Sequence, residues 1–205
     1  MHIGLIGGIG PAATDFYYRR LIATFASRKT PLELTIAHAD TPTLLKNLAS
    51  SDKAAQATIF TRLTKRLAAA GSNCVAITSI AGHFCMDAFK AVSPLPAVDM
   101  IVEVNRAIAE RGLSRVGILG TQTVMETRFY GGVTSAQIIP PRGQDLLDVH
   151  QACDNGGLRR RDRRSAISLR CGQSSAAQRT TALRRSCLGG LILCWFTMSE
   201  PRTSR

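Results

Sequence analysis

The sequence predicts an α/β protein in which parallel strands alternate with helices. Short apolar runs rich in β-branched residues alternate with stretches of helical periodicity over residues 1–150, and glycines follow two of these runs. Apolar strands of this kind are typical of parallel sheets that helices cover on both faces. Ligands of such sheets bind beyond the carboxyl ends of the strands. We therefore expect a site in the loops that follow those ends.

The first half of the pattern occupies residues 1–97. Pro11 begins its first helix, since a proline in the first helical turn loses no intrahelical hydrogen bond. Apolar residues between Ala54 and Ala70 recur at helical spacing and predict the next helix. The expected strands are 2–7, 32–38 and 74–80, and the expected helices are 11–26, 51–70 and 83–92.

The second half begins at residue 98 and runs to residue 153. Its expected strands are 116–119 and 136–139, and its expected helices are 98–111, 121–130 and 144–153. The segment Gly117-Ile-Leu-Gly120-Thr121 echoes Gly4-Leu-Ile-Gly7-Gly8. This echo indicates two similar Rossmann-like halves, and we expect the active site between them.

Residues 154–205 form an Arg-rich tail without helical or strand periodicity. Residues 1–150 hold 15 Lys and Arg against 11 Asp and Glu, whereas residues 151–205 hold 11 Arg against three acidic residues. A disordered basic arm that binds nucleic acid is one interpretation, and an unusual helical closure of the fold is another. We favour a third, in which the gene is translated out of frame from about residue 150. Because the excess charge belongs to the tail, a nucleic-acid partner is not expected for the domain itself.

The composition fits a globular cytoplasmic protein, with 45% hydrophobic and 20% charged residues. No apolar run has the length of about 18 residues that a transmembrane helix needs, and the N-terminus has no basic segment ahead of its apolar stretch. The cysteines form no CxxC pair and no metal-ligand spacing with histidine, which indicates free thiols and no bound metal. They are Cys74, Cys85, Cys153, Cys171, Cys187 and Cys194.

The glycine-rich loop after the first strand allows two interpretations. The segment Gly8-x-Gly10-x-x-Ala13 formally fits a dinucleotide fingerprint, and Asp40 near the end of the second strand could contact a ribose. Such first turns are common in α/β proteins of every function, however. We favour a tight turn whose backbone N–H groups and helix N-terminus face a carboxylate.

Two motifs resemble the aspartate/glutamate racemase family. The first is Ile3-Gly-Leu-Ile-Gly-Gly-Ile-Gly-Pro-Ala-Ala-Thr-Asp-Phe-Tyr-Tyr-Arg-Arg, and the second is Val116-Gly-Ile-Leu-Gly-Thr-Gln-Thr-Val-Met-Glu-Thr-Arg-Phe-Tyr. The segment Pro94-Leu-Pro96-Ala-Val-Asp99 is also similar to the family. The resemblance covers about three-quarters of the chain and implies cofactor-independent racemisation, with one acid/base group on each side of the substrate's α-carbon.

The resemblance places the first of these groups in a Cys-Asn-Thr-x-His segment, which here reads Ser79-Ile80-Ala81-Gly82-His83. The histidine is kept, whereas the cysteine is replaced by Ser79. A serine hydroxyl needs a base to activate it, although some branches of the family carry threonine at this position. We expect Ser79 and His83 to be the catalytic residues; the alternatives are a small turn residue and a helix-terminal histidine. Thr78 should point to the opposite face of the strand.

The second acid/base group normally lies in a Leu-Gly-Cys-Thr-Glu segment near the C-terminus. The only matching text is Leu188-Gly189-Gly190-Leu191-Ile192, where Gly190 stands in place of cysteine and the Thr-Glu pair is missing. Cys187 and Cys194 flank the segment at the wrong offsets. The resemblance therefore leaves the second group unidentified.

Substrate binding is expected from hydroxyl, amide and backbone groups on the strand-end loops. Gly8, Thr14, Thr121 and Thr123 offer donors suited to a carboxylate, although these threonines could instead cap helices. His38 and Asp40 close the second strand, and Asn47 and Lys46 lie just beyond it.

The sequence as a whole predicts a cofactor-independent racemase of an acidic amino acid such as aspartate or glutamate. The alternative is a catalytically inactive remnant of the same fold, or a protein that binds small carboxylates. The expected partner is the small-molecule substrate, with no membrane partner, and the resemblance implies a homodimer.

Overall fold

A computed structural model describes residues 1–154, 185–188 and 191–194. The chain divides into two compact units, Met1–Glu103 and Val104–Arg205. Residues 98–103, which the sequence analysis assigned to the second half, group with the first unit.

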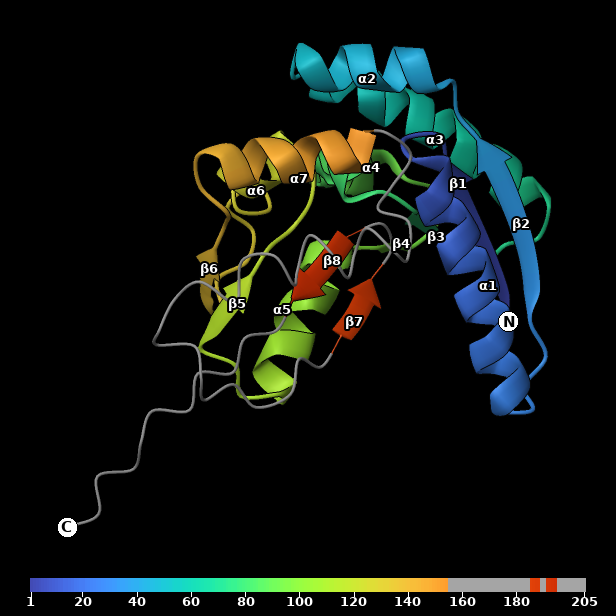
Figure 1. Cartoon of the computed structure of the whole chain (residues 1–205). Coiled ribbons are helices and arrows are strands. Elements are labelled where there is room, and N and C mark those ends of the chain that lie inside the picture. The colour runs from blue at the N-terminus through green and yellow to red at the C-terminus, as the bar shows by residue number, and fades with distance from the viewer. Residues whose placement is uncertain (155–184, 189–190, 195–205) are drawn as a thin grey trace. The chain divides into compact units, whose positions relative to one another are not determined.

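The first unit is built on a four-stranded parallel sheet. Its strands are β1 (His2–Gly7), β2 (Glu33–His38), β3 (Cys74–Ile77) and β4 (Ala97–Val98). They are arranged in the order β2-β1-β3-β4, and every neighbouring pair is parallel (Figure 1). The predicted α/β class with a parallel sheet is therefore confirmed.

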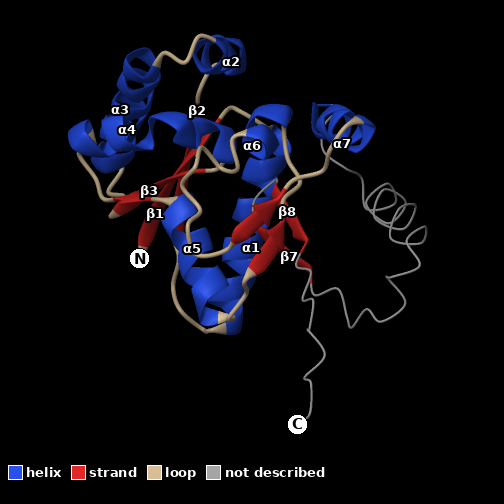
Figure 2. Ribbon diagram, turned by 90° about the vertical axis from the view of Figure 1, so that its left-hand side faces the viewer, coloured by secondary structure: helices blue, strands red, loops and turns tan. Residues whose placement is uncertain are grey.

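Helices cover both faces of this sheet. They are α1 (Pro11–Ser27), α2 (Thr41–Ala49), α3 (Lys53–Ala69), the 3-10 helix η1 (Ile80–Cys85), α4 (Met86–Val92) and the start of α5 (Met100–Glu110). Helix α1 lies on one face, and α3 and α4 lie on the other (Figures 1 and 2). Neighbouring residues of a strand face opposite sides of the sheet. Accordingly, a Cβ added to Gly4 would meet Leu67 of α3, whereas one added to Gly7 would meet Thr14 of α1.

The core of the unit lies between the sheet and α3. Phe60 of α3 and Phe89 of α4 are 1% and 0% exposed, and their rings meet edge to face with centroids 5.7 Å apart. Ile6 and Ile77, the last apolar residues of β1 and β3, pack in the same cluster. Burial of each such side chain contributes roughly 1.5–3 kcal/mol. Part of the buried core thus lies beneath the carboxyl ends of the two central strands.

Two elements of the first unit differ from the sequence analysis. Helix α2 was not expected; it begins after Asp40, whose carboxylate accepts the Thr43 N–H at 3.0 Å and caps the helix. The run 74–80 was expected to be one strand, but β3 ends at Ile77 and η1 begins at Ile80. The chain turns there because the carbonyl of Ser79 accepts the N–H of Gly82 and closes the first 3-10 turn.

The second unit repeats the strand–helix pattern. Strands β5 (Arg115–Gly117) and β6 (Gln137–Ile139) pair in parallel, and the helices are α6 (Gln122–Glu126) and α7 (Gln144–Asp154). Strands β7 (Arg185–Leu188) and β8 (Leu191–Cys194) form an antiparallel pair. The rest of the Arg-rich tail lies outside the described residues, so its proposed origin in a shifted reading frame remains a prediction.

The helix expected over 121–130 ends early, at Glu126. The next turn contains three non-glycine residues with positive φ, Arg128, Phe129 and Tyr130. Left-handed backbone costs roughly 1–2 kcal/mol for each such residue. The side chain of Phe129 is fully buried.

The structure contains no helix, within the part of the chain it describes, that combines the length and hydrophobicity needed to cross a membrane.

Gly82→Ala should destabilise the first unit, because an added Cβ would lie 2.8 Å from Cγ2 of Ile77 and 3.2 Å from the Phe60 ring. Overpacking of this kind costs about 1–3 kcal/mol, which urea unfolding would measure as a lower midpoint. Ile77→Ala removes the contacting methyl group, so the double variant should lose less stability than the two single variants together. Strict additivity of the two losses would contradict this packing arrangement.

Candidate active site

The carboxyl ends of β1 and β3 form the candidate site. The chain runs from β1 to its neighbour β2 on one side, and from β3 to its neighbour β4 on the other side. The two neighbouring strands therefore send their connections in opposite directions, which is the topological switch point where doubly wound sheets bind ligands. The Gly8–Gly10 turn follows β1, and Thr78 and Ser79 follow β3. Four of the predicted residues, Gly8, Thr14, Ser79 and His83, belong to the segments that leave these two ends.

Gly8 forms the tight turn that was predicted for the glycine-rich loop. Its φ is +145°, and an added Cβ would lie 2.8 Å from both the carbonyl oxygen of Ala39 and a methyl carbon of Leu44. Only glycine lets the β1–α1 turn approach the β2–α2 turn this closely. The Gly8 carbonyl accepts a 2.7 Å hydrogen bond from the Thr41 hydroxyl, which ties the two turns together.

Thr14 lies in the second turn of α1 and bonds across to β3. Its Oγ1 is 2.8 Å from Oγ1 of Thr78, and Thr78 Oγ1 in turn donates to the carbonyl oxygen of Ile6 at 3.0 Å. Thr78 is only 1% exposed. The alternative that Thr14 caps a helix does not apply, because Gly10 is the N-cap of α1 and no side chain caps it.

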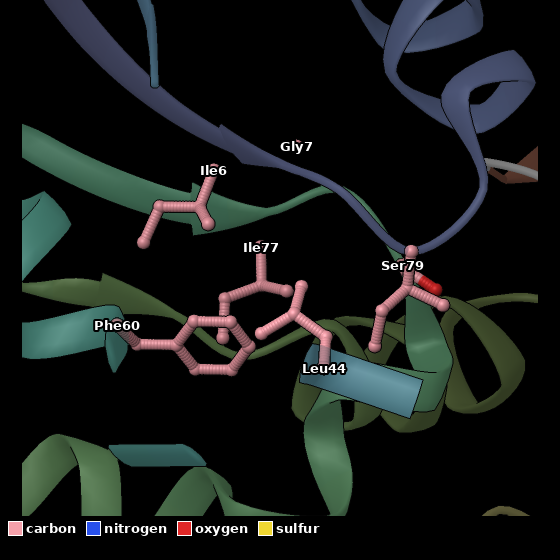
Figure 3. A pocket seen from close by; sticks show the side chains of 7 residues that line it. Ile6, Gly7, Leu44, Phe60, Ile77 and Ser79 are labelled. Carbon is pink, nitrogen blue, oxygen red and sulfur yellow. The ribbon is translucent and has the colours of Figure 1, made fainter. Parts of the chain in front are cut away.

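Ser79 follows Thr78 beyond the end of β3, and it is the N-cap residue of η1 with an extended backbone (φ −134°, ψ 130°). It lines a small pocket with Ile6, Gly7, Ile9, Leu44, Phe60 and Ile77. In Figure 3, Ser79 lies at the end of this pocket away from Phe60. Ser79 is partly buried, and no described residue forms a side-chain hydrogen bond to its hydroxyl. No base among the described residues is placed to activate that hydroxyl.

His83 is buried, 3% exposed, and both of its ring nitrogens bond to backbone. Nδ1 lies 2.9 Å from the carbonyl oxygen of Ser79 and must donate to it, while Nε2 accepts the N–H of Met100 at 3.2 Å. This pattern requires the neutral ring with its proton on Nδ1. Burial lowers the pKa of His83. The negative charge of Asp99 opposes this shift in part, whereas the positive charge of Lys90, which forms an ion pair with Asp99, adds to it. His83 thus holds the Ser79 loop against the start of α5.

The predicted residues of β2 and α2 have local roles. His38 is exposed at the end of β2. The Asp40 carboxylate is occupied in capping α2, and hydrogen bonds from the Thr43 hydroxyl and N–H lower its pKa. Asn47 is buried and donates at 3.1 Å to Gln56 of α3, a side chain that is completely buried. None of these three bonds to Thr14, Thr78 or Ser79 among the described contacts.

Thr121 and Thr123 belong to the second unit, at the start of α6. Thr121 is the N-cap residue of this helix, but its hydroxyl forms no capping hydrogen bond, and Thr123 is exposed. The Gln122 N–H donates to the His150 ring at 3.3 Å. Gly190, where the sequence analysis looked for the second acid/base group, lies outside the described residues.

Sequence reasoning did not select two residues that shape the site. Thr78 was noted only for its direction, and Gly82 was not considered, although each lies beside a selected residue. Strand alternation could have paired Thr78 with the helix above it, but only coordinates show that Thr14 is its partner. Among the described residues, no group of three His, Cys, Asp or Glu side chains could hold a metal ion.

This topology defines the class of protein as a doubly wound α/β fold whose parallel sheet has its switch point between β1 and β3. Three solved structures share the fold. The first is a Yersinia pestis protein provisionally assigned as an Asp/Glu racemase, with a TM-score of 0.68 and 23% identity over 81% of this chain and 76% of that one. The second is an aspartate racemase homologue from Pyrococcus horikoshii, with a TM-score of 0.65 and 23% identity over 82% of this chain and 79% of that one. The third is an aspartate racemase from Picrophilus torridus, with a TM-score of 0.62 and 15% identity over 83% of this chain and 74% of that one.

The family model for Asp/Glu/hydantoin racemases matches residues 6–169, most of the chain. The protein therefore belongs to the Asp/Glu/hydantoin racemase family, which confirms the resemblance seen in its motifs and supports a racemase-type function. The matched range extends past residue 153, where we expected the family pattern to end.

The stability of the protein should fall as the pH drops below about 6.5, the ordinary pKa of histidine. Folding lowers the pKa of His83, so the unfolded state binds more protons, and stability is full above that pH and lost toward the folded-state pKa. Each pH unit in this window costs at most about 1.4 kcal/mol.

His83→Gln can keep both backbone bonds but does not titrate, so this part of the pH dependence should disappear in urea unfolding curves measured across the window. An unchanged pH dependence in the variant would show that His83 is not its source.

Proposed function

We propose that this protein racemises the α-carbon of an acidic amino acid such as aspartate or glutamate without a cofactor, with Ser79 as one acid/base group. The observation that carries the proposal is the Ser79 hydroxyl, which lies without a described side-chain partner at the switch point in a member of a racemase family. The substrate class follows from what the family and the related structures are described as acting on. A cytoplasmic location and a homodimer remain expectations from the sequence.

Racemisation requires removal of the α-proton on one face and delivery of a proton on the other. Ser79 projects from the end of β3 toward the pocket, where it can meet an α-carbon that lies above β1 and β3. His83 is best assigned a positioning role, because both ring nitrogens are used by backbone groups. The Gly8 turn would bind the substrate, and Thr121 and Thr123 are proposed substrate contacts from the second unit.

A second candidate function is supported by a specific observation. Serine is a weak base unless a neighbouring group accepts its proton, and no described side chain bonds to the Ser79 hydroxyl. The same geometry would therefore suit a protein that binds a small carboxylate without turning it over. Racemase and binding protein differ in one property only, which is exchange of the α-proton.

Exchange of the α-proton in deuterium oxide, followed by proton NMR on both enantiomers of aspartate and glutamate, separates the two functions. If the protein is a racemase, the full-length protein should catalyse loss of the α-proton signal, and Ser79→Ala should abolish this exchange. Ser79→Cys should raise the exchange rate, because a thiol has a pKa of about 8.5 and forms its anion far more readily than a hydroxyl.

Thr123→Ala, on an exposed residue of the second unit, shows whether that unit contributes to the same reaction. Absence of exchange with all four substrates, in both the wild type and Ser79→Cys, would contradict the racemase and favour the binding protein.

A further inference from the structure

Strand β2 is an open edge of the first sheet. It pairs with β1 on one side, and no strand that the structure describes pairs with its other side. The Glu33 N–H donates to the Met1 carbonyl at 3.0 Å, and the Ala39 N–H donates to the Gly7 carbonyl at 2.8 Å. Because the backbone groups of successive strand residues point in alternating directions, the odd-numbered residues of β2 bond to β1. The N–H and C=O groups that point toward the open edge are those of Leu34, Ile36 and His38.

The same three residues place their side chains on the α1 face of the sheet. Gly7 faces α1, and the register sets His38 beside Gly7, so every second residue back along β2 shares that face. Ile36 is 43% exposed there and Leu34 is half-buried. Helix α1 therefore leaves apolar surface of β2 uncovered next to the open backbone edge.

The flank of α1 that faces β2 is also apolar and exposed. Tyr17 points toward the sheet and its hydroxyl donates to Met100, which follows β4. In a right-handed crossover from β1 to β2, the helical rotation of 100° per residue turns from this side of α1 toward β2. Tyr18 and Ile22 lie on that flank and are 43% and 44% exposed. Figure 1 shows β2 at the end of the sheet beside α1.

Strand β2 has none of the features that protect natural edge strands from pairing. Such strands usually carry lysine or proline, or contain a bulge. The segment Glu33–His38 contains neither residue, and its register with β1 runs without interruption over six residues. An unprotected apolar edge of this kind is a template for another strand.

The strand that fits this edge best is β2 of a second copy. In an antiparallel pair centred on Ile36, that residue lies opposite Ile36 of the second copy, and Leu34 lies opposite His38. Each of these pairs exchanges two backbone hydrogen bonds, so every open group of β2 finds a partner. Glu33 then lies opposite Ala39, and no two like charges stand directly opposite each other. The edge is therefore complementary to itself.

We propose that two copies of this chain associate through β2, which pairs antiparallel with its own copy about a two-fold axis at Ile36. The first sheets of the two copies then form one continuous sheet, with both α1 helices on the same face. Tyr18 and Ile22 of each copy flank the seam and add apolar area to the backbone pairing. The resemblance implied a homodimer without assigning a surface to it, and the proposal does not depend on racemase activity.

Sedimentation velocity of the full-length protein tests the proposal. At tens of micromolar the wild type should sediment with twice the chain mass of 22.1 kDa. Ile36→Lys and Ile36→Glu should each weaken self-association by about tenfold or more, because like charges meet at the two-fold axis. An equimolar mixture of the two variants should recover the dimer, because residue 36 of one copy then faces the opposite charge.

A matched control and a second readout complete the test. Val92→Lys, at the end of α4, changes a valine that is 55% exposed and should leave the dimer intact. Amide hydrogen exchange should show protection at Leu34, Ile36 and His38 in the dimer, and dilution of the wild type should remove it. The N–H groups of Thr35 and Ala37 bond to β1 and should stay protected throughout, which also establishes that the strand is folded.

A wild type that remains monomeric at several hundred micromolar would overturn the proposal. So would a dimer that persists in folded Ile36→Lys and Ile36→Glu, since association through any other surface, including the Arg-rich tail, would survive both substitutions. Failure of the mixed variants to associate would overturn the two-fold pairing at Ile36, as would rapid exchange of the three edge N–H groups in the wild-type dimer.

Discussion

The parallel pairing of β1 with β3 is the constraint on which the candidate site depends. It places Ile6 opposite Ile77, so that the Ile6 carbonyl receives both the N–H and the hydroxyl of Thr78 at 3.0 Å. This one carbonyl aligns the end of β3 with the glycine turn of β1 and fixes the proton of Thr78. The direction of the Thr14 hydroxyl follows from that bond, because Thr14 must then donate to Thr78. The end of β3 and the glycine turn lie next to a buried apolar cluster that includes Ile6, Ile77 and Phe60.

Most of the fold could be predicted from the sequence because local signals and tertiary structure agree there. The run His2–Gly7 is strongly apolar and ends in glycine, and Pro11 begins α1 where predicted. Helix α2 was missed, although Asp40 followed by Thr41-Pro42 is a capping signal, because its apolar pattern spans only nine residues. The helix expected over 121–130 ends at Glu126, and the left-handed turn with the buried Phe129 that follows it has no signal in the local apolar pattern.

The site was predictable only as far as strand ends can be predicted. Gly8, Thr14 and Ser79 belong to the segments that leave the ends of β1 and β3, which the strand pattern could indicate. His83 was expected to transfer protons, but its second bond goes to the Met100 N–H, 17 residues further along the chain, and no local pattern contains that partner. Asn47 likewise has a partner, Gln56 of α3, that only the packing of α2 against α3 reveals. Residues whose roles depend on long-range contacts were therefore the ones that sequence reasoning assigned least well.

The direction of the hydroxyl chain that runs from Thr14 through Thr78 to the Ile6 carbonyl can be measured without any ligand. Thr78 is buried, so its hydroxyl proton should exchange slowly and give a resonance that NMR can observe. If that proton lies on the Ile6 carbonyl, its resonance will remain protected and observable in Thr14→Val, shifted only by loss of the bond that Thr78 accepts. A resonance that disappears in folded Thr14→Val would show that Thr78 donates to Thr14, and would contradict this direction of the hydroxyl chain.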